Sequence, residues 1–271
     1  MSDNAAVRRR RRRRWGPLAQ VGYALGLPVL LILLWWWRTT SAPNFFYPTP
    51  PQLWHTFWDT WASSRFSQDF LPSIGRLALG IVATIVLGVL LGVLIGSFRW
   101  LRVLTEPVLE FFRAVPPPVL VPVLMLLIGI NTQMRVIVII SGAIWPVLLN
   151  TVEGVRAVDQ VLSDTARTYR IGGFARYRYL VLPGAGPQIM AGIRQCLSIS
   201  LILMVISEMF GSSSGLGFTI VLFQRTFAVA QMWSGIVVLG LIGFALSVIF
   251  QIVERRVLRW YFGQREVQRE Q

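Results

Sequence analysis

The sequence contains no lysine, one cysteine and one histidine among its 271 residues. A nucleotide site of the P-loop type needs a lysine for the phosphates, so the chain cannot contain one. Cys196 is alone in an apolar stretch, which excludes an internal disulfide and a cysteine metal cluster. His55 has no second histidine as a ligand partner, and Gly211 to Gly215 match GxSxG only by letters, without the downstream histidine of a hydrolase. We therefore predict no catalytic residue, metal or cofactor in this chain, which is not an enzyme.

Charged residues are also few, at 14%, whereas 54% of the residues are apolar. The apolar residues form blocks too long for a soluble core, so we predict an all-α, polytopic integral membrane protein. Its parts are a basic tail (1–17), a first span with an extracytoplasmic segment (18–72), a transmembrane domain (73–258) with a polar cytoplasmic segment (159–183), and a C-terminal tail (259–271). The six predicted spans cover about Leu18 to Trp37, Ile74 to Ser97, Val103 to Ile130 with an interruption, Arg135 to Val152, Ile193 to Phe210 and Trp233 to Val253.

All of the basic charge is arginine, and the net charge is +14. Seven consecutive arginines at 8–14 precede the first apolar run, and most of the others flank apolar blocks on alternate sides. This asymmetry places both termini in the cytoplasm of a bacterial plasma membrane. The first run is too long for a signal peptide, and Pro43 disfavours cleavage after it. We expect the arginines to attract lipid headgroups and predict no nucleic-acid partner, although a polyanion-binding arm is the alternative interpretation of the terminal run.

A stripe of small residues marks the second predicted span at strict four-residue spacing. Small residues at this spacing allow close helix approach in lipid, so we predict a helix-packing face there. The stripe consists of Gly80, Thr84, Gly88, Gly92 and Gly96.

Prolines interrupt the third predicted span, and an acidic residue lies inside the fifth. Pro117, Pro118 and Pro122 break an apolar run, which frees backbone groups that lipid cannot satisfy. We therefore expect this span to face protein or a water-filled translocation path. Glu208 costs roughly 2.5 kcal/mol or more if it faces lipid, so it needs a structural partner or a place on the path or its gate. The sequence leaves both roles open.

The longest polar interval between apolar blocks runs from Asp164 to Pro183. After the N-cap Asp159, we predict a helix of about three turns, a turn at glycine, and a short second helix from Phe174 that ends at Pro183. One face of the second helix is aromatic and the other is basic. Such a hairpin suits docking to a partner at the membrane surface, and a solvated loop that only fixes topology is the alternative.

This interval resembles the EAA signature of membrane subunits of bacterial ATP-binding cassette importers. Asp164, Thr165 and Ala166 occupy the Glu-Ala-Ala positions, and Leu180 with the pair Leu182 and Pro183 closes the pattern. The stretches YPTPPQLW, RAVPPPVLVPVLMLLIGI, LLNTVEGVRAVD and SEMFGSSSGLGF are similar to the nitrate, sulfonate and taurine branch of this family.

The resemblance implies a permease that pairs with a second copy as a homodimer and receives solute from an extracytoplasmic binding protein. ATP and Mg would bind to a cytoplasmic ATPase dimer, whose subunits are separate chains. The coupling residues that it implies are Asp164, Thr165, Ala166, Arg167, Arg170, Gly172, Gly173, Phe174 and Tyr177. Arg170 stands where the signature has glycine, so we predict that the first helix extends past Arg170 and turns at Gly172.

The solute implied by this branch is a small anion such as an aliphatic sulfonate, taurine or nitrate. A vitamin precursor such as a pyrimidine is the alternative solute for the same architecture. An ion-coupled secondary transporter is a second function, but Glu208 is the only clear titratable group that such a carrier could use in its spans. A membrane scaffold without transport activity would leave the interrupted span unexplained.

Overall fold

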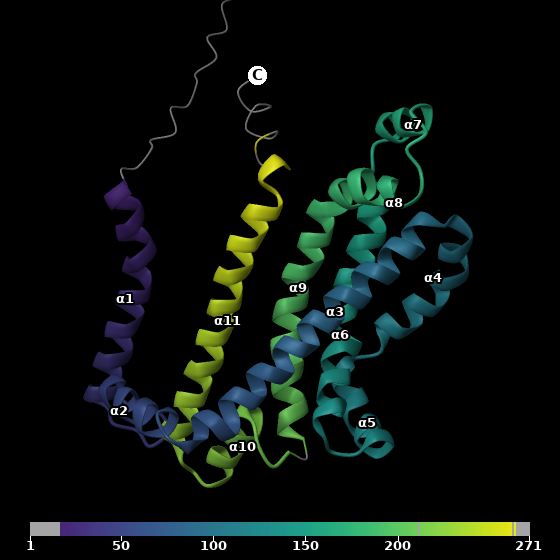
Figure 1. The fold of residues 1–271 in the computed structure, drawn as a ribbon. Helices are drawn as coiled ribbons and strands as arrows, with labels where there is room; N and C mark the ends of the chain where they lie inside the picture. The colour runs from purple at the N-terminus through teal and green to yellow at the C-terminus, as the bar shows by residue number, and fades with distance from the viewer. Residues whose placement is uncertain (1–16, 211, 262, 264–271) are drawn as a thin grey trace, which may run out of the picture.

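The computed structural model describes residues 17–210, 212–261 and 263, and this part of the chain is helical throughout, apart from loops and one isolated bridge (Figure 1). The all-α prediction is therefore confirmed. The helical elements are α1 (Pro17–Ser41), α2 (Pro50–Trp61), η1 (Phe66–Phe70), α3 (Leu71–Ser97), α4 (Arg99–Ala114), η2 (Pro117–Val119), α5 (Leu120–Ile128), α6 (Thr132–Arg156), α7 (Gln160–Thr168), α8 (Gly173–Arg176), η3 (Tyr177–Val181), α9 (Leu182–Met209), α10 (Leu216–Arg225) and α11 (Val229–Val257).

Four stretches of the described chain are long and apolar enough to cross a membrane: Phe66–Ser97, Thr132–Arg156, Gly173–Met209 and Val229–Val257. A fifth crossing results if α4 and the η2–α5 segment form one span, bent by 75° between its halves. The prolines thus interrupt the helix where the sequence predicts a break. The count of six spans remains a prediction, because the side chains of residues 17–25 in α1 lie outside the described part.

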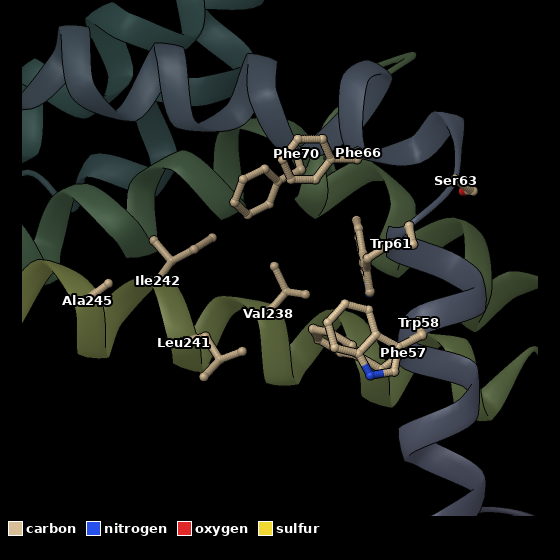
Figure 2. Close-up of a pocket in the computed structure, with 11 residues that line it drawn as sticks. Phe57, Trp58, Trp61, Ser63, Phe66, Phe70, Val238, Leu241, Ile242 and Ala245 are labelled. Atoms are coloured by element: carbon tan, nitrogen blue, oxygen red, sulfur yellow. The ribbon is translucent and has the colours of Figure 1, made fainter.

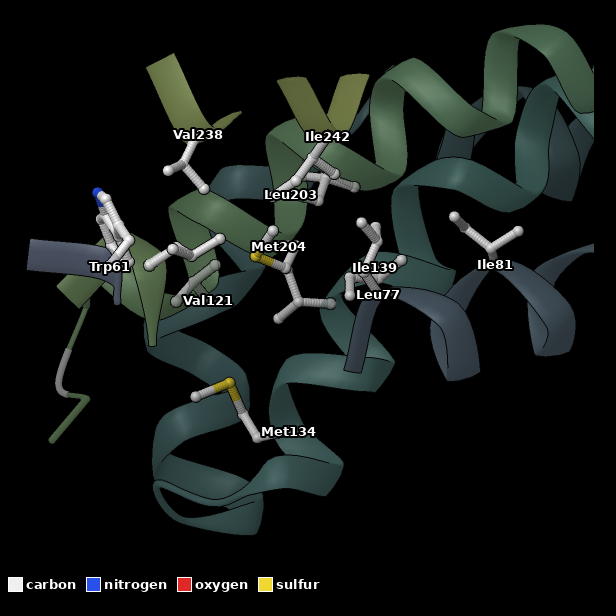
Figure 3. Packing of buried hydrophobic residues seen from close by; sticks show 12 residues of the cluster. Trp61, Leu77, Ile81, Val121, Met134, Ile139, Leu203, Met204, Val238 and Ile242 are labelled. Atoms are coloured by element: carbon white, nitrogen blue, oxygen red, sulfur yellow. The ribbon is translucent and has the colours of Figure 1, made fainter. Parts of the chain in front are cut away.

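The core lies where α3, α6 and α9 pack against one another (Figure 3). Val138, Ile139 and Met204 have no exposed surface, and Leu77 and Leu203 are 2% exposed. Each apolar side chain buried in this way stabilises the bundle by van der Waals packing, since lipid supplies no hydrophobic driving force between helices.

The small-residue stripe of α3 lies along α6. A Cβ added at Gly80, Gly88, Gly92 or Gly96 would meet α6 side-chain atoms at 2.6 to 2.9 Å, too close for any side chain. The fifth member of the stripe, Thr84, is fully buried. Glycine at these positions therefore allows the close approach of the two helices. The α6 residues that face the four glycines are Ile139, Val147, Thr151 and Val155.

The helices α2 and α10 were not predicted from the sequence. Thr49 caps α2 by accepting a hydrogen bond from the Gln52 amide at 3.4 Å, and prolines occupy the first helical positions. This N-cap with Pro at N1 is a helix-start pattern. α10 begins after Gly215, which has a φ of 119° that favours glycine.

Candidate functional site

The polar segment 159–183 forms a hairpin that projects from one end of the bundle, opposite to α2 and α10 (Figure 1). Asp159 caps α7, because its side chain accepts a hydrogen bond from the Leu162 amide at 3.0 Å. The helix then runs from Gln160 to Thr168.

The prediction that this first helix extends past Arg170 is wrong. The helix ends at Thr168, and Arg170 itself has the left-handed φ of 57°. The Ile171 amide donates to the Ala166 carbonyl at 2.8 Å, and the Arg170 amide donates to the Arg167 carbonyl at 3.0 Å. This pair of bonds is a Schellman cap, which satisfies the last carbonyls and offsets the roughly 1–2 kcal/mol that a left-handed arginine costs.

The turn predicted at Gly172 lies at Tyr169 and Arg170 instead, directly after α7. Gly172 is extended, whereas Gly173 has a φ of 56° and begins the next helix. An added Cβ at either glycine would meet no atom within 4 Å, so backbone conformation rather than crowding favours glycine at Gly173.

The sequence predicted that the second helix of the hairpin ends at Pro183, and this prediction is wrong. Helical geometry continues from Gly173 to Met209, and Pro183 lies in the first turn of α9. A π-helical turn, η3, precedes it and is closed by a bond from the Leu182 amide to the Tyr177 carbonyl. Because this wider turn changes the hydrogen-bond pattern before the proline, the missing Pro183 amide does not break the helix. The hairpin is therefore continuous with the α9 span.

The hairpin exposes apolar side chains at its surface. Val161 is 72% exposed, Tyr169 75% and Phe174 80%. The ion pair of Asp164 with Arg167 is also exposed, in the helical i,i+3 arrangement. Large apolar groups in such a protruding position are typical of a protein interaction site.

The predicted coupling residues do not all face outward. Asp164, Thr165, Arg167, Arg170, Gly172, Gly173 and Phe174 are exposed, Tyr177 is half-buried, and Ala166 is 6% exposed. Ala166 therefore packs inside the hairpin, where its carbonyl also accepts the capping bond from Ile171. Ala166 therefore contributes to the fold of the hairpin and not to its exposed surface.

Glu208 is fully buried near the other end of the bundle and has a partner. Its Oε1 accepts a hydrogen bond from Arg76 at 2.7 Å and from the Ser73 hydroxyl at 2.8 Å. Its Oε2 accepts from Ser73 at 2.9 Å and from the Gly217 amide at 3.1 Å. These bonds connect α9 to α3 and to α10, so the carboxylate meets the requirement for a partner in its span.

A second buried carboxylate extends this network. Asp69 in η1 accepts a bond from the Gly215 amide at 2.9 Å and from Arg65 at 3.2 Å. The Ser73 hydroxyl in turn accepts the Leu216 amide at 2.9 Å, which anchors the start of α10. Sequence patterns did not identify Ser73, Arg76 or Asp69 as site residues. An arginine inside an apolar block, three residues after a serine, was the signal for Ser73 and Arg76.

The prolines of the predicted path lie on and beside the break between α4 and α5. Pro117 is half-buried against α6, where its Cγ would lie 2.6 Å from a Cβ added at Gly142. Pro118 and Pro122 are exposed. The hydrogen-bond partners of Glu208 lie on α3 and α10 and not on this proline segment.

An apolar cavity of about 670 Å³ lies between α2, η1 and α11 (Figure 2). Aromatic side chains line it, and Trp61 forms one wall with its indole bonded to Ser234 at 3.1 Å. Such a lining suits apolar groups better than a small ion. Within the described residues, no cluster of three or more histidine, cysteine or acidic side chains could hold a metal.

The chain is similar to known transport proteins over most of its length. Residues 84–259 match the family described as the inner membrane component of binding-protein-dependent transport systems. The putative aliphatic sulfonates transport permease protein SsuC of Bacillus subtilis is 30% identical, over 79% of this chain and 77% of that protein. The taurine transport system permease protein TauC of Escherichia coli is 26% identical over 72% and 70% of the two chains. The bicarbonate transport system permease protein CmpB of Synechococcus elongatus is 29% identical over 70% and 68%.

Proposed function

Because the chain belongs to the family of inner membrane components of binding-protein-dependent transport systems, we propose that it is the permease that carries a small anion across the membrane. Relatives named for aliphatic sulfonates, taurine and bicarbonate support an anionic solute, since these solutes share a negatively charged oxyanion group. An aliphatic sulfonate, taurine or nitrate is the best assignment, and a neutral vitamin precursor such as a pyrimidine is the alternative.

The projecting hairpin is the observation that carries the proposal. Its exposed Val161, Tyr169 and Phe174 would bury against a cytoplasmic ATPase, and its continuity with α9 links that contact to a span. When ATP binding closes the ATPase dimer, the hairpin would move with it and shift α9 relative to its neighbours. Two identical permease chains and one extracytoplasmic binding protein would complete the importer.

The path would lie along the broken α4–α5 span and α9. Freed backbone groups near Pro117, Pro118 and Pro122 need protein or water beside them, which a path supplies. Glu208 would shape the extracytoplasmic gate by joining α3, α9 and α10, rather than bind the solute. An ion-coupled carrier is less well supported, because both Glu208 oxygens are already engaged by donors.

The test is co-purification of the tagged chain from its native membrane, followed by an ATPase assay of the complex. Wild type is expected to retain an ATPase subunit. Alanine at both Val161 and Phe174 is expected to lower the recovered ATPase activity by about tenfold or more, as for central apolar residues of an interface. The matched control is Phe244→Ala, which removes an aromatic side chain of similar exposure, 70%, from α11.

Two results would count against the proposal. Wild type that retains no ATPase in gentle detergent would argue for a carrier of another class. Equal losses in the hairpin and Phe244 variants would show that the hairpin is not the specific contact.

A further inference from the structure

The Arg135 side chain is buried, and its Nε lacks a hydrogen-bond partner among the described residues. It lies near the start of α6 and is 5% exposed. Its Nε makes no hydrogen bond within the part of the chain that the structure describes. A buried cation in this situation is costly unless something else pairs with it.

The carboxylates of the neighbouring network are not available to pair with it. Arg135 interacts electrostatically with Arg76 and Glu208. The Glu208 carboxylate already accepts hydrogen bonds from Arg76 at Oε1 and from the Gly217 amide at Oε2, and its two oxygens share the single hydroxyl proton of Ser73. Arg76 therefore uses the carboxylate that Arg135 would otherwise need.

Asp69 is engaged in the same way. Its two oxygens accept the Gly215 amide and the Arg65 guanidinium. The network thus combines three arginines with two carboxylates and carries one positive charge in excess. The start of α6 adds the partial positive charge of a helix N-terminus.

We infer that Arg135 is an anion-binding residue, which takes the oxyanion group of the solute at the extracytoplasmic end of the path. A planar guanidinium presents paired N–H groups that match two oxygens of a sulfonate, nitrate or bicarbonate ion. A neutral solute would leave the excess charge unpaired and would be disfavoured. The inference rests on the proposed function, because it names the residue that selects an anion on that path.

The surrounding geometry also sets when the anion binds. Because Arg135 is enclosed by the packed helices here, the anion reaches it only when α6 and its neighbours separate, as a change between two access states requires. Arg76 stays bonded to Glu208, so the network holds the gate together while Arg135 accepts the solute.

The experiment measures anion binding by the purified chain without its ATPase. Thermal unfolding is followed by tryptophan fluorescence in detergent, while methanesulfonate replaces chloride at constant ionic strength. Wild type is expected to show a rising Tm with methanesulfonate and no rise with the neutral analogue dimethyl sulfone. In Arg135→Gln the half-saturating concentration is expected to increase by about tenfold or more, the value of a charge-assisted hydrogen bond.

Two further variants make the result decisive. Arg225→Gln removes an exposed arginine at the end of α10 and is expected to keep the wild-type response. Arg135→Lys keeps the charge but loses the planar fork, so binding is expected to weaken by a smaller factor. If Arg135→Gln does not fold, the lysine variant decides: weaker binding supports the inference and unchanged binding overturns it.

Other outcomes also overturn the inference. An unchanged response in Arg135→Gln would place the anion elsewhere. A wild-type Tm that is the same in chloride and methanesulfonate would indicate a resident halide or no anion site. Since co-purification tests the ATPase partner separately, a chain that recruits an ATPase without an anion response refutes this inference alone.

Discussion

Glu208 and Arg76 form an ion pair with almost no contact to solvent, with side-chain exposures of 0% and 8%. Replacing Glu208 by glutamine would leave Arg76 charged, buried and unpaired. We expect this change to lower the free energy of unfolding in mixed micelles by about 3–5 kcal/mol, as for other broken buried pairs. Glu254→Gln removes a pair with Arg194, whose side chain is 60% exposed, and is expected to cost about 1 kcal/mol or less. Similar losses in both variants would show that burial does not strengthen the first pair.

The sequence showed that Glu208 would need a partner inside the membrane, but it did not show that this partner is Arg76. Arg76 is 132 residues away in the chain, and its position fits a topology-determining arginine equally well. Arg170 was predicted wrongly for a different reason. The cost of a left-handed side chain is visible in the sequence, whereas the two capping bonds that offset it depend on the folded helix end.

Helix packing between α3 and α6 depends on the absence of side chains. A Cβ at Gly92 would lie 2.6 Å from the Thr151 Cβ and 2.9 Å from the Leu148 carbonyl, which is backbone and cannot move aside. We expect Gly92→Ala to separate the two helices and to destabilise the bundle by roughly 1–3 kcal/mol. Gly75→Ala in the same helix is the control, because its Cβ would meet no atom within 4 Å.

Thermal stability of the purified variants checks this expectation. A lower Tm is expected for Gly92→Ala, and a Tm equal to wild type or slightly higher for Gly75→Ala, because alanine favours helix more than glycine. Equal Tm values for the two variants would contradict the close contact.

Elements with long apolar runs were predictable, and short or irregular ones were not. The predicted spans from Ile74, Arg135 and Trp233 begin within four residues of α3, α6 and α11. By contrast, α10 has only 10 residues, too few for a clear periodic pattern. The extension of α9 through Pro183 was missed because the π turn that permits it depends on hydrogen bonds, not on residue type.

At the scale of the whole molecule, α7 and α10 lie at opposite ends of the bundle (Figure 1). Together with the arginine asymmetry of the sequence, this arrangement predicts that α7 is cytoplasmic and α10 extracytoplasmic. Cys196 is buried and can be replaced by serine to give a cysteine-free chain. Cysteines introduced at the exposed Thr168 and Thr226 then report the two ends.

Labelling of intact spheroplasts with a membrane-impermeant maleimide measures this orientation. Thr226→Cys is expected to react from outside, and Thr168→Cys only after the membrane is permeabilised. The reverse pattern would invert the predicted topology and would remove the hairpin from the side where an ATPase could reach it.

The first long helix, α1, has α2 as its main contact within the described chain and stands apart from α11 (Figure 1). This separation bears on how the protein is made. During synthesis α1 leaves the ribosome before α3, α6 and α9, and it can enter the bilayer before any of them is made. Biogenesis would then divide into an early step that orients the chain and a later step that assembles the bundle, and α2 would join the two.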